Sequence, residues 1–244
     1  MDYHMISRTG GRDHNEDSVG AKICGRHVCF ALADGLGGHG KGEVASKLAV
    51  DTVLKLFETW ESKDGGGEFL EQGFENCQRS IRERQQEEHA WGEMKTTLVV
   101  LSIVEGMIRW GHIGDSRLYY FYRNRLKERT KDHSVPQMLV AAGQLKEKQI
   151  RFHEDRNRLL RVLGVEWNRP CYELSAPVKA GGRQAFLLCS DGFWELIDEK
   201  QMTRCLKRSA SAREWVLGME KEILENGSAG SMDNYSAIGV LLNE

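Results

Sequence analysis

Apolar residues run continuously through several short segments of the chain, and these runs predict β-strands. They lie in HVCFALAD (27–34), in the long segment that starts with TTLVVLSIV (96–130), in QAFLLCSD (184–191) and in YSAIGVLL (235–242). Runs rich in β-branched and aromatic residues are typical of buried strands. The segment 96–130 is long enough for several strands. We predict a meander there, with turns at Glu105-Gly106, Gly114-Asp115 and Arg123-Asn124.

A spacing of three and four residues between apolar positions predicts helices elsewhere. One helix carries Val44, Leu48, Val53, Leu56, Phe57 and Trp60, and a second carries Phe69, Leu70, Phe74, Cys77 and Ile81. A later helix is expected to begin after Ser211, a good N-cap, and to stop at Gly227. Strands that come in runs, with the helices segregated, favour an α+β fold with an antiparallel sandwich over a parallel sheet.

Length, composition and charge limit the class of protein and the partners that can be expected. The chain has 244 residues, three prolines, no internal repeat and no low-complexity tract, so a single domain over 1–244 is expected. A formal net charge of −2 without a basic patch argues against nucleic acid as a partner. The longest apolar stretch is too short to cross a bilayer, and six cysteines without a CxxC pair fit a reducing cytosol. We therefore expect a cytoplasmic monomer that does not bind membranes.

The glycine-rich stretch GLGGHGK (35–41) matches two sequence motifs of phosphate-binding loops, GxGxxG and GxxxxGK. Asp34 argues against both, because its carboxylate precedes the first glycine and would face the phosphates. Gly42 stands where a phosphate loop needs a hydroxyl for magnesium, and no strand ending in an acid follows about 20 residues later. A nucleotide-binding protein that uses this loop remains an alternative. It would keep tight nucleotide binding in the variant Asp34→Asn.

Four aspartates lie beside predicted strands. Asp34 and Asp191 end two of them, Asp233 precedes the last one, and Asp115 lies in a turn. Most Asp-Gly and Asp-Asn pairs are simply turns. Several carboxylates at one rim of a sheet, however, would repel each other unless a cation joined them. Hard oxygen ligands without neighbouring His or Cys favour Mg²⁺ or Mn²⁺ over zinc, so the pattern indicates a site for such ions.

Nearly the whole chain resembles the metal-dependent serine/threonine protein phosphatases, the protein phosphatase 2C or PPM family, in a compact form like its bacterial members. The motifs that carry the resemblance follow in order: GGRDHNEDS, ADGLGGHGKGE, TTL, GHIGDSRLY, DHS, NRLLRVLG, LCSDGFWE and MDNYSAIGV. The resemblance implies a four-layer α-β-β-α sandwich with two central, mainly antiparallel sheets. It also implies hydrolysis of phosphoserine and phosphothreonine by attack of a water that bridges two Mn²⁺ or Mg²⁺ ions. The substrates implied are phosphorylated proteins in signal transduction, in opposition to a serine/threonine kinase.

The resemblance assigns metal ligands to the residues that match its motifs. Asp34 is expected to bridge the two ions, and the carbonyl of Gly35 to bind one of them. Asp191 and Asp233 are expected to complete the set of carboxylates. A non-catalytic phosphoprotein-binding module of the same fold is a second alternative. The loss of one metal carboxylate would mark such a module, and none is lost here.

Three residues near the N-terminus receive roles around the metal ions. Glu16 and Asp17 are expected to hold metal-bound waters or to bind the ions through them. Arg12, five residues before Asp17, is expected to bind the oxygens of the substrate phosphate group. A planar guanidinium fits that task better than a lysine ammonium does. No cysteine has an arginine six residues further on, so a cysteine nucleophile is not expected.

A third, weaker metal site is implied at Asp115 and at the acid four residues after Asp191. Family members often have Asp there, whereas this chain has Glu195, which is longer by one methylene. Some members place His directly after the Asp-Gly pair as a proposed general acid, but this chain has Leu36. His39 is predicted to belong to the structure of the loop. The identity of the general acid therefore stays open.

Two histidines and one charged run receive simpler interpretations. His112 and His133 have no partner at ligand spacing, so we predict polar contacts in a strand and a loop rather than metal binding. The run KEKQIRFHEDRNR (146–158) is typical of a solvated surface. The resemblance places this run in a flap over about 132–165, which could face the substrate.

Overall fold

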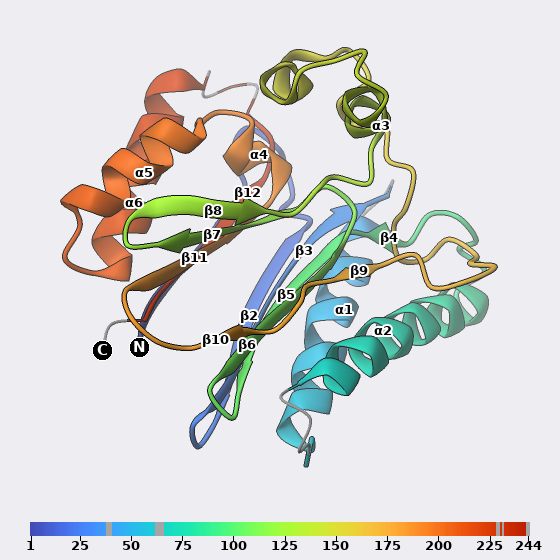
Figure 1. Cartoon of the computed structure of the whole chain (residues 1–244). Coiled ribbons are helices and arrows are strands. Elements are labelled where there is room, and N and C mark those ends of the chain that lie inside the picture. Colours follow the sequence, from blue (N-terminus) through green and yellow to red (C-terminus); the bar gives the residue numbers. More distant parts are fainter. Residues whose placement is uncertain (38–40, 62–65, 228–229, 231, 243–244) are drawn as a thin grey trace.

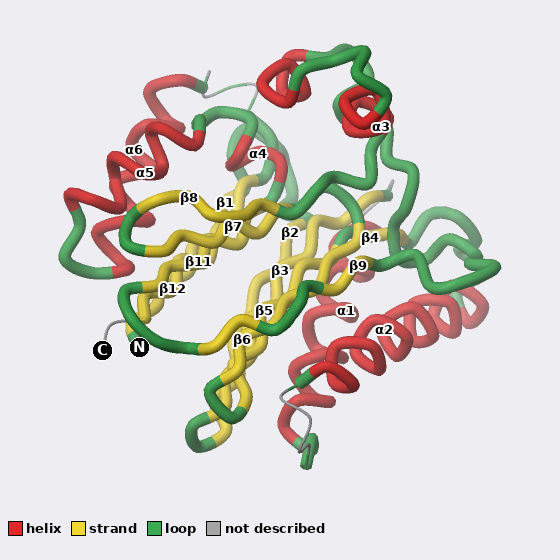
Figure 2. Tube along the Cα trace, in the orientation of Figure 1, coloured by secondary structure: helices red, strands yellow, loops and turns green. Residues whose placement is uncertain are grey.

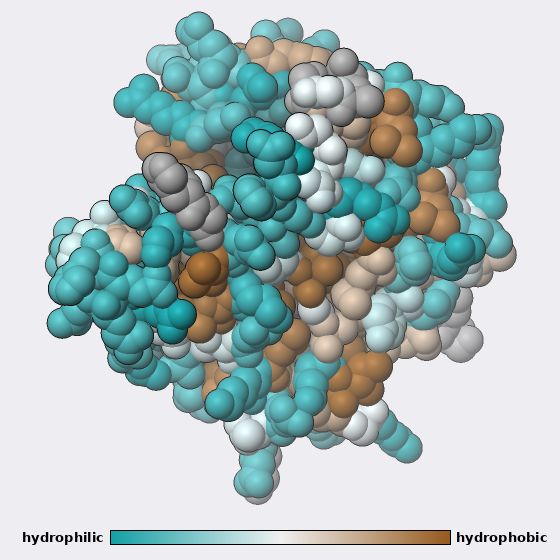
Figure 3. Space-filling view, turned by 180° about the vertical axis from the view of Figure 1, so that it is seen from behind, coloured by the Kyte–Doolittle hydropathy of each residue, from teal (hydrophilic) through white to brown (hydrophobic). Residues whose placement is uncertain are grey.

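The computed structural model describes residues 1–37, 41–61, 66–227, 230 and 232–242. Two β-sheets are stacked face to face, and helices cover their outer faces (Figures 1 and 2). The predicted four-layer α-β-β-α sandwich is therefore confirmed. The surface shown in Figure 3 is mainly hydrophilic, with apolar residues in separate patches. In the described part of the chain, no helix combines the length and the apolar character needed to cross a membrane.

The smaller sheet has five strands in the order β1, β12, β11, β7, β8, and all neighbouring strands are antiparallel. The strands are β1 (Asp2–Arg8), β7 (Arg117–Tyr122), β8 (Arg125–Arg129), β11 (Gln184–Cys189) and β12 (Tyr235–Leu242). The helices on this side are α4 (Asp191–Trp194), α5 (Glu199–Arg208) and α6 (Ala212–Asn226). As predicted, Ser211 caps α6: its Oγ accepts a hydrogen bond from the Glu214 amide over 3.1 Å.

The larger sheet has seven strands. Five follow the order β10, β6, β5, β3, β2, while β4 pairs with β3 and β9 pairs with β6. The strands are β2 (Asp17–Cys24), β3 (His27–Leu36), β4 (Lys95–Thr96), β5 (Leu98–Val104), β6 (Met107–Ile113), β9 (Glu173–Leu174) and β10 (Val178–Lys179). The helices α1 (Lys41–Glu58) and α2 (Gly67–Glu87) cover its outer face (Figure 1). These two helices match the two apolar spacings found in the sequence, except that α1 ends at Glu58 and Trp60 packs against the core from beyond its end.

Side chains on the two faces of each central strand enter different parts of the core. In β3, Phe30 and Leu32 belong to the apolar cluster between the sheets, which also contains Phe186 of β11. Ala31 and Ala33, which point to the other face, belong to the cluster beneath α1 and α2. Because both faces are buried, the strand reads as a continuous apolar run rather than an alternating one.

The prediction of one meander over 96–130 is wrong at Gly114-Asp115. The two flanking strands belong to different sheets, since β6 pairs with β5 whereas β7 pairs with β11. Gly114 has a φ of +99°, a conformation that favours glycine. Its backbone binds His133 instead of a hairpin partner: the His133 amide donates to the Gly114 carbonyl, and the Gly114 amide donates to His133 Nδ1. The chain therefore crosses from one sheet to the other at this point.

The segment 132–165 lies above one end of the sandwich (Figure 1). It contains α3 (Val135–Ala141) and a 3-10 helix, η1 (Glu147–Phe152). Ser134 Oγ accepts a hydrogen bond from the Gln137 amide and caps α3, and Pro136 follows in the first turn. The remainder of the segment consists mainly of turns and loops. Its role as a flap stays a prediction.

Candidate active site

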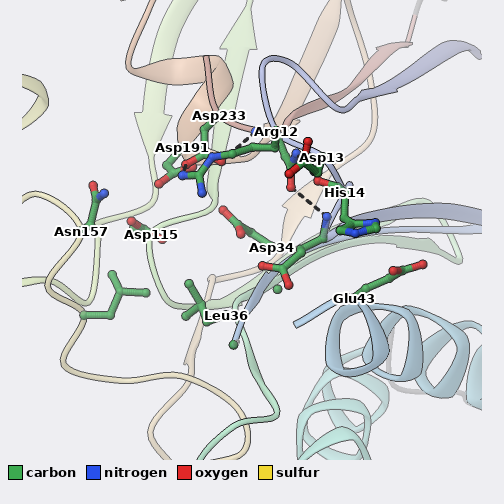
Figure 4. Close-up of a pocket in the computed structure, with 15 residues that line it drawn as sticks. Arg12, Asp13, His14, Asp34, Leu36, Glu43, Asp115, Asn157, Asp191 and Asp233 are labelled. Carbon is green, nitrogen blue, oxygen red and sulfur yellow. Dashed lines mark hydrogen bonds and ion pairs between the residues drawn. The ribbon is translucent and has the colours of Figure 1, made fainter. Parts of the chain in front are cut away.

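A cleft of about 690 Å³ opens at the end of the sandwich, and we call it the acidic cleft because seven of its lining residues carry carboxylates. It is lined by Arg12, Asp13, His14, Glu16, Asp34, Gly35, Leu36, Gly37, Glu43, Asp115, Asn157, Leu159, Asp191, Asp233 and Asn234 (Figure 4). Most of the residues predicted for the site are therefore brought together in one place. Asp17 and Glu195 do not belong to this lining.

Both sheets contribute carboxylates to the acidic cleft. Asp34 lies near the end of β3, which continues to Leu36 and not only to Asp34 as the sequence suggests. Asp191 follows β11 as the first residue of α4, and Asp233 lies just before β12. Asp115 lies where the chain crosses from β6 to β7. Strand ends and the connections next to them hold these side chains on a rigid frame.

Close backbone contacts explain the glycines at the rim of the cleft. A Cβ atom on Gly35 would lie 2.2 Å from the carbonyl oxygen of Gly42, and one on Gly37 would lie 2.1 Å from that of Glu93. Glycine is thus required where β3 approaches the first turn of α1 and where the chain after β3 passes Glu93. Packing between backbones accounts for these glycines without a bound nucleotide. His39 and Gly40 of the same loop lie outside the described residues.

The carboxyl groups of the acidic cleft are crowded. Burial, together with the nearby carboxylate of Asp191, raises the pKa of Asp34 and of Asp115 well above its usual range. Burial and Asp233 also raise the pKa of Asp191. The carboxyl groups of Asp34 and Asp191 thus lie close enough to influence each other's pKa. Several negative charges at short range are unfavourable, and a cation would remove that cost.

Arg12 brings a positive charge to this cluster. Its Nη2 donates a hydrogen bond of 2.7 Å to Asp233 Oδ2 (Figure 4). Asp233 Oδ1 accepts a second hydrogen bond from the Asn234 amide over 2.8 Å. The side chain of Arg12 is 60% exposed, and that of Asp233 is 37% exposed. The guanidinium therefore stands at the mouth of the cleft, where it can reach a ligand.

Asp17 lies behind the cleft and is buried. Its Oδ2 accepts a hydrogen bond of 2.7 Å from Ser190 Oγ, whereas its Oδ1 has no hydrogen-bond partner. Burial raises the pKa of Asp17 to about 7. Its backbone faces Asp34 in the register of β2 and β3. Asp17 thus has an unused buried oxygen next to the carboxylate cluster.

Asn234 is a site residue that the sequence interpretation missed. Its Oδ1 accepts a hydrogen bond from the Glu16 amide, and its Nδ2 donates to the carbonyls of Thr9 and His14. These three bonds tie the N-terminal loop that carries Arg12 and Glu16 to the start of β12. The sequence signals were its place beside Asp233 and within the motif MDNYSAIGV, but no role was assigned to it. Asn157 and Leu159, from the segment 132–165, also line the cleft.

Glu195 lies in an adjoining pocket that shares four lining residues with the acidic cleft, namely Arg12, Asn157, Asp191 and Asp233. Its Oε1 forms an ion pair of 2.9 Å with Arg156 Nε. Burial and the charge of Asp191 raise the pKa of Glu195 to about 7. The structure therefore places Asp115 and Glu195 in different pockets, with Asp191 lining both.

The two histidines stack on each other, with ring centroids 4.7 Å apart. His112 Nε2 bonds to the carbonyl of Lys131 over 2.7 Å, and His133 Nδ1 accepts from the Gly114 amide over 3.2 Å. These polar contacts are as predicted. Glu173 of β9 lies close to both rings, and the three side chains offer ligand atoms within 4.8 Å of one another. Spacing along the sequence could not reveal this neighbour, because β9 is distant in the chain. Because His133 Nδ1 accepts this hydrogen bond, a neutral His133 carries its proton on Nε2. Neither ring nitrogen then has a free lone pair for a cation, which argues against a metal ion there.

Known proteins share both the sequence pattern and the fold. Residues 7–222 match the family described as protein phosphatase 2C. The serine/threonine phosphatase Stp of Listeria welshimeri is 30% identical over 245 residues, covering 95% of this chain and 92% of the relative. The crystal structure of the serine/threonine phosphatase PstP/Ppp of Mycobacterium tuberculosis superposes with a TM-score of 0.83 at 28% identity, covering 99% of this chain and 98% of that one.

A further solved structure shows what a relative binds. The catalytic domain of the serine/threonine protein phosphatase PstP was solved in complex with two manganese ions. It superposes with a TM-score of 0.82 at 26% identity and covers 99% of this chain and 98% of that one. The predicted resemblance is confirmed by these matches. The chain therefore belongs to the protein phosphatase 2C family of serine/threonine protein phosphatases.

Proposed function

We propose that the acidic cleft binds two Mn²⁺ or Mg²⁺ ions and hydrolyses phosphoserine and phosphothreonine in proteins by attack of a water that bridges the ions. The observation that carries this proposal is the convergence of Asp34, Asp191 and Asp233 from separate elements on one cleft. The two manganese ions in the structure of PstP support the choice of cofactor. Asp34, Asp191, Asp233 and the carbonyl of Gly35 would hold the ions.

The chemistry of the donor set fits divalent ions. All the donors are oxygens, the kind of ligand that Mg²⁺ and Mn²⁺ prefer. Burial and the neighbouring carboxylate of Asp191 raise the pKa of Asp34, which supports a site where negative charges are crowded and a cation would be stabilising. The free Oδ1 of Asp17 and the carboxylate of Glu16 are available to orient water. Divalent ions bound here supply positive charge and lower the pKa of bound water.

Arg12 would bind the phosphate group of the substrate. A phosphate monoester carries a charge of about −1.5 to −2 at neutral pH, and a cleft of carboxylates repels it. The guanidinium of Arg12 can meet two phosphate oxygens with two parallel hydrogen bonds. Its present partner, Asp233, is a proposed metal ligand, so metal binding would free Arg12 for the phosphate.

The same cleft supports two further parts of the proposal. Asp115 is buried within the cluster and would be one ligand of a third, weaker ion. Glu195 could join it only by leaving Arg156, to which it is now paired. The segment 132–165 reaches the cleft through Asn157 and Leu159, so we assign it contact with the substrate.

Release of phosphate by the metal-stripped protein tests this function. We expect no turnover of p-nitrophenyl phosphate or of a phosphothreonine peptide in EDTA, and turnover of both after addition of Mn²⁺. Full activity in EDTA would contradict a metal mechanism. If Mn²⁺ and the phosphopeptide both bind and no phosphate is released, the chain is a non-catalytic binding module. Tight nucleotide binding that survives Asp34→Asn would instead support the glycine-loop alternative.

A further inference from the structure

A second hollow begins at one end of the acidic cleft. It has a volume of about 420 Å³, lies along α1, and is called the α1 groove here. It is lined by Glu43, Val44, Lys47, Leu48, Asp51 and Arg84. Glu43 also lines the acidic cleft, so the two hollows meet at this residue. In Figure 4, Glu43 lies on the side of the cleft away from Asp191 and Asp233.

The floor of the α1 groove is apolar. Val44 and Leu48 are four residues apart on α1, so their side chains lie next to each other on one face of the helix. Both are only partly buried, although they also pack against the core beneath α1 and α2. An apolar side chain of a ligand would cover the part that remains exposed.

Among the charged residues at the rim of the α1 groove, the carboxylate of Glu43 is available to bind a ligand. Lys47 is paired with Asp51 over 2.6 Å, and Arg84 is paired with Glu88 over 2.6 Å. Glu43, by contrast, is exposed and forms no ion pair among the described residues. It faces a cleft that already contains an excess of carboxylates. A cationic side chain of a ligand is therefore the group that fits beside Glu43.

We propose that the α1 groove binds the polypeptide of the phosphoprotein substrate next to its phosphorylated residue. A basic side chain of the substrate lies at Glu43, and an apolar one lies on Val44 and Leu48. The shared lining residue carries the assignment: Glu43 lines both hollows, so a chain that runs from the acidic cleft into the groove passes Glu43. This inference rests on the proposed function, because it assumes that the phosphate is held at the carboxylate cluster.

The charge at Glu43 can be tested with phosphothreonine peptides that differ at one position. Two sets carry Arg, Ala or Glu within three residues of the phosphothreonine, one set before it and one after it. In at least one set we expect kcat/KM to be about two- to fivefold higher for Arg than for Ala, as for an exposed ion pair. In Glu43→Gln the ratio should fall to about one. Each ratio is taken within one enzyme, so a general change in turnover cancels.

The apolar floor can be tested with a matched pair of variants. Leu48 and Leu56 are both partly buried leucines of α1 that pack on the same core, but only Leu48 lines the α1 groove. We expect Leu48→Ala to lower kcat/KM for an optimal phosphopeptide about three- to tenfold relative to that for p-nitrophenyl phosphate. Leu56→Ala should leave that ratio unchanged. Melting temperatures of both variants show whether each is folded.

Specific outcomes would overturn the proposal. They are equal kcat/KM for the Arg and Ala peptides in the unmodified enzyme, a preference for Arg that survives Glu43→Gln, or the same loss of the ratio in Leu48→Ala and Leu56→Ala. The small substrate separates this result from failure of the proposed function. If p-nitrophenyl phosphate is not hydrolysed with Mn²⁺, the proposed function is wrong. If it is hydrolysed and the peptides are not distinguished, only the α1 groove is wrong.

Discussion

Arg12 and Asp233 are 221 positions apart in the sequence, yet Arg12 Nη2 donates a hydrogen bond of 2.7 Å to Asp233 Oδ2. The pair joins the loop before β2 to the segment just before β12. It also joins the proposed phosphate-binding group to a proposed metal ligand. Arg12 is thus placed to exchange one anionic partner, a carboxylate, for another, a phosphate.

Arg12→Ala should therefore weaken binding of the substrate. A charge-assisted hydrogen bond contributes about 1.5–3 kcal/mol, so we expect kcat/KM for a phosphopeptide to fall roughly ten- to a hundredfold. Most of the loss should appear in KM, because the guanidinium binds the phosphate in the ground state as well as in the transition state. Arg12→Lys should recover part of it. Unchanged kinetics in Arg12→Ala would show that another group binds the phosphate.

Metal binding separates this role from an indirect effect on the metal site. The side chains of Arg12 and Asp233 are 60% and 37% exposed, and an exposed ion pair contributes about 0–1 kcal/mol. The Kd for Mn²⁺, measured by calorimetry, should therefore change less than about fivefold in Arg12→Ala. A larger loss of Mn²⁺ affinity would mean that Arg12 supports the metal ligands instead of the phosphate.

Asp191→Asn and Asp233→Asn should abolish turnover and keep the fold. Each change removes a proposed metal ligand, but it also removes one negative charge from a crowded cluster. In EDTA, the melting temperature of Asp191→Asn should equal or exceed that of the unmodified chain. Asp13→Asn is a matched control, since Asp13 lines the same cleft without a proposed role as a ligand. Near-normal turnover at low Mn²⁺ in either ligand variant would contradict the assignment.

The stability of the metal-free protein should fall as the pH rises from about 4 to about 7. Burial raises the pKa of Asp17 from its ordinary value of 3.8 to about 7, and burial also raises the pKa of Asp34. Above pH 4 these groups ionise in the unfolded chain while they stay protonated in the folded one, so rising pH favours unfolding. Mn²⁺ replaces the protons and should raise the melting temperature more at pH 7.5 than at pH 5. Scanning calorimetry with Mn²⁺ or EDTA at the two pH values measures this, and an equal gain at both would refute it.

Gly35→Ala should destabilise the protein and disturb the cleft. The new Cβ would lie 2.2 Å from the carbonyl oxygen of Gly42, so the backbone of β3 or of α1 must shift. We expect a loss of about 1–3 kcal/mol in the free energy of unfolding, measured by denaturant titration, together with a loss of activity. Gly218→Ala in α6 is the control, because its Cβ would meet Cys205 Sγ at an ordinary 3.9 Å. That change should be neutral or stabilising by up to about 1 kcal/mol.

The apolar runs of the sequence were sufficient to locate the strands that are buried on both faces, among them β3, β5, β11 and β12. They were not sufficient for β1 and β2. Both have many partly exposed positions and polar residues, so neither forms an apolar run. These strands exist because β12 and β3 present edges with unpaired backbone groups to them. Only the assembled sheets supply those edges.

The choice of sheet also depended on tertiary structure. The strands on either side of Gly114-Asp115 are largely buried on both faces, so a hairpin within one sheet and a crossing between two sheets have similar sequence patterns. The contacts of Gly114 with His133, which is 19 positions away, distinguish them. A pattern of local hydrophobicity contains no information about such a partner.

The sequence by itself determined the residue types of the site and their places beside the strands. Asp34, Asp115, Asp191 and Asp233 could be predicted, because carboxylates at strand ends share one rim of a sheet. Only the tertiary structure decided that Arg12 pairs with one of them and that Glu195 lies in an adjoining pocket. The reason is that burial, pKa and the reach of a side chain depend on neighbours from distant parts of the chain, and these come together only when the two sheets stack.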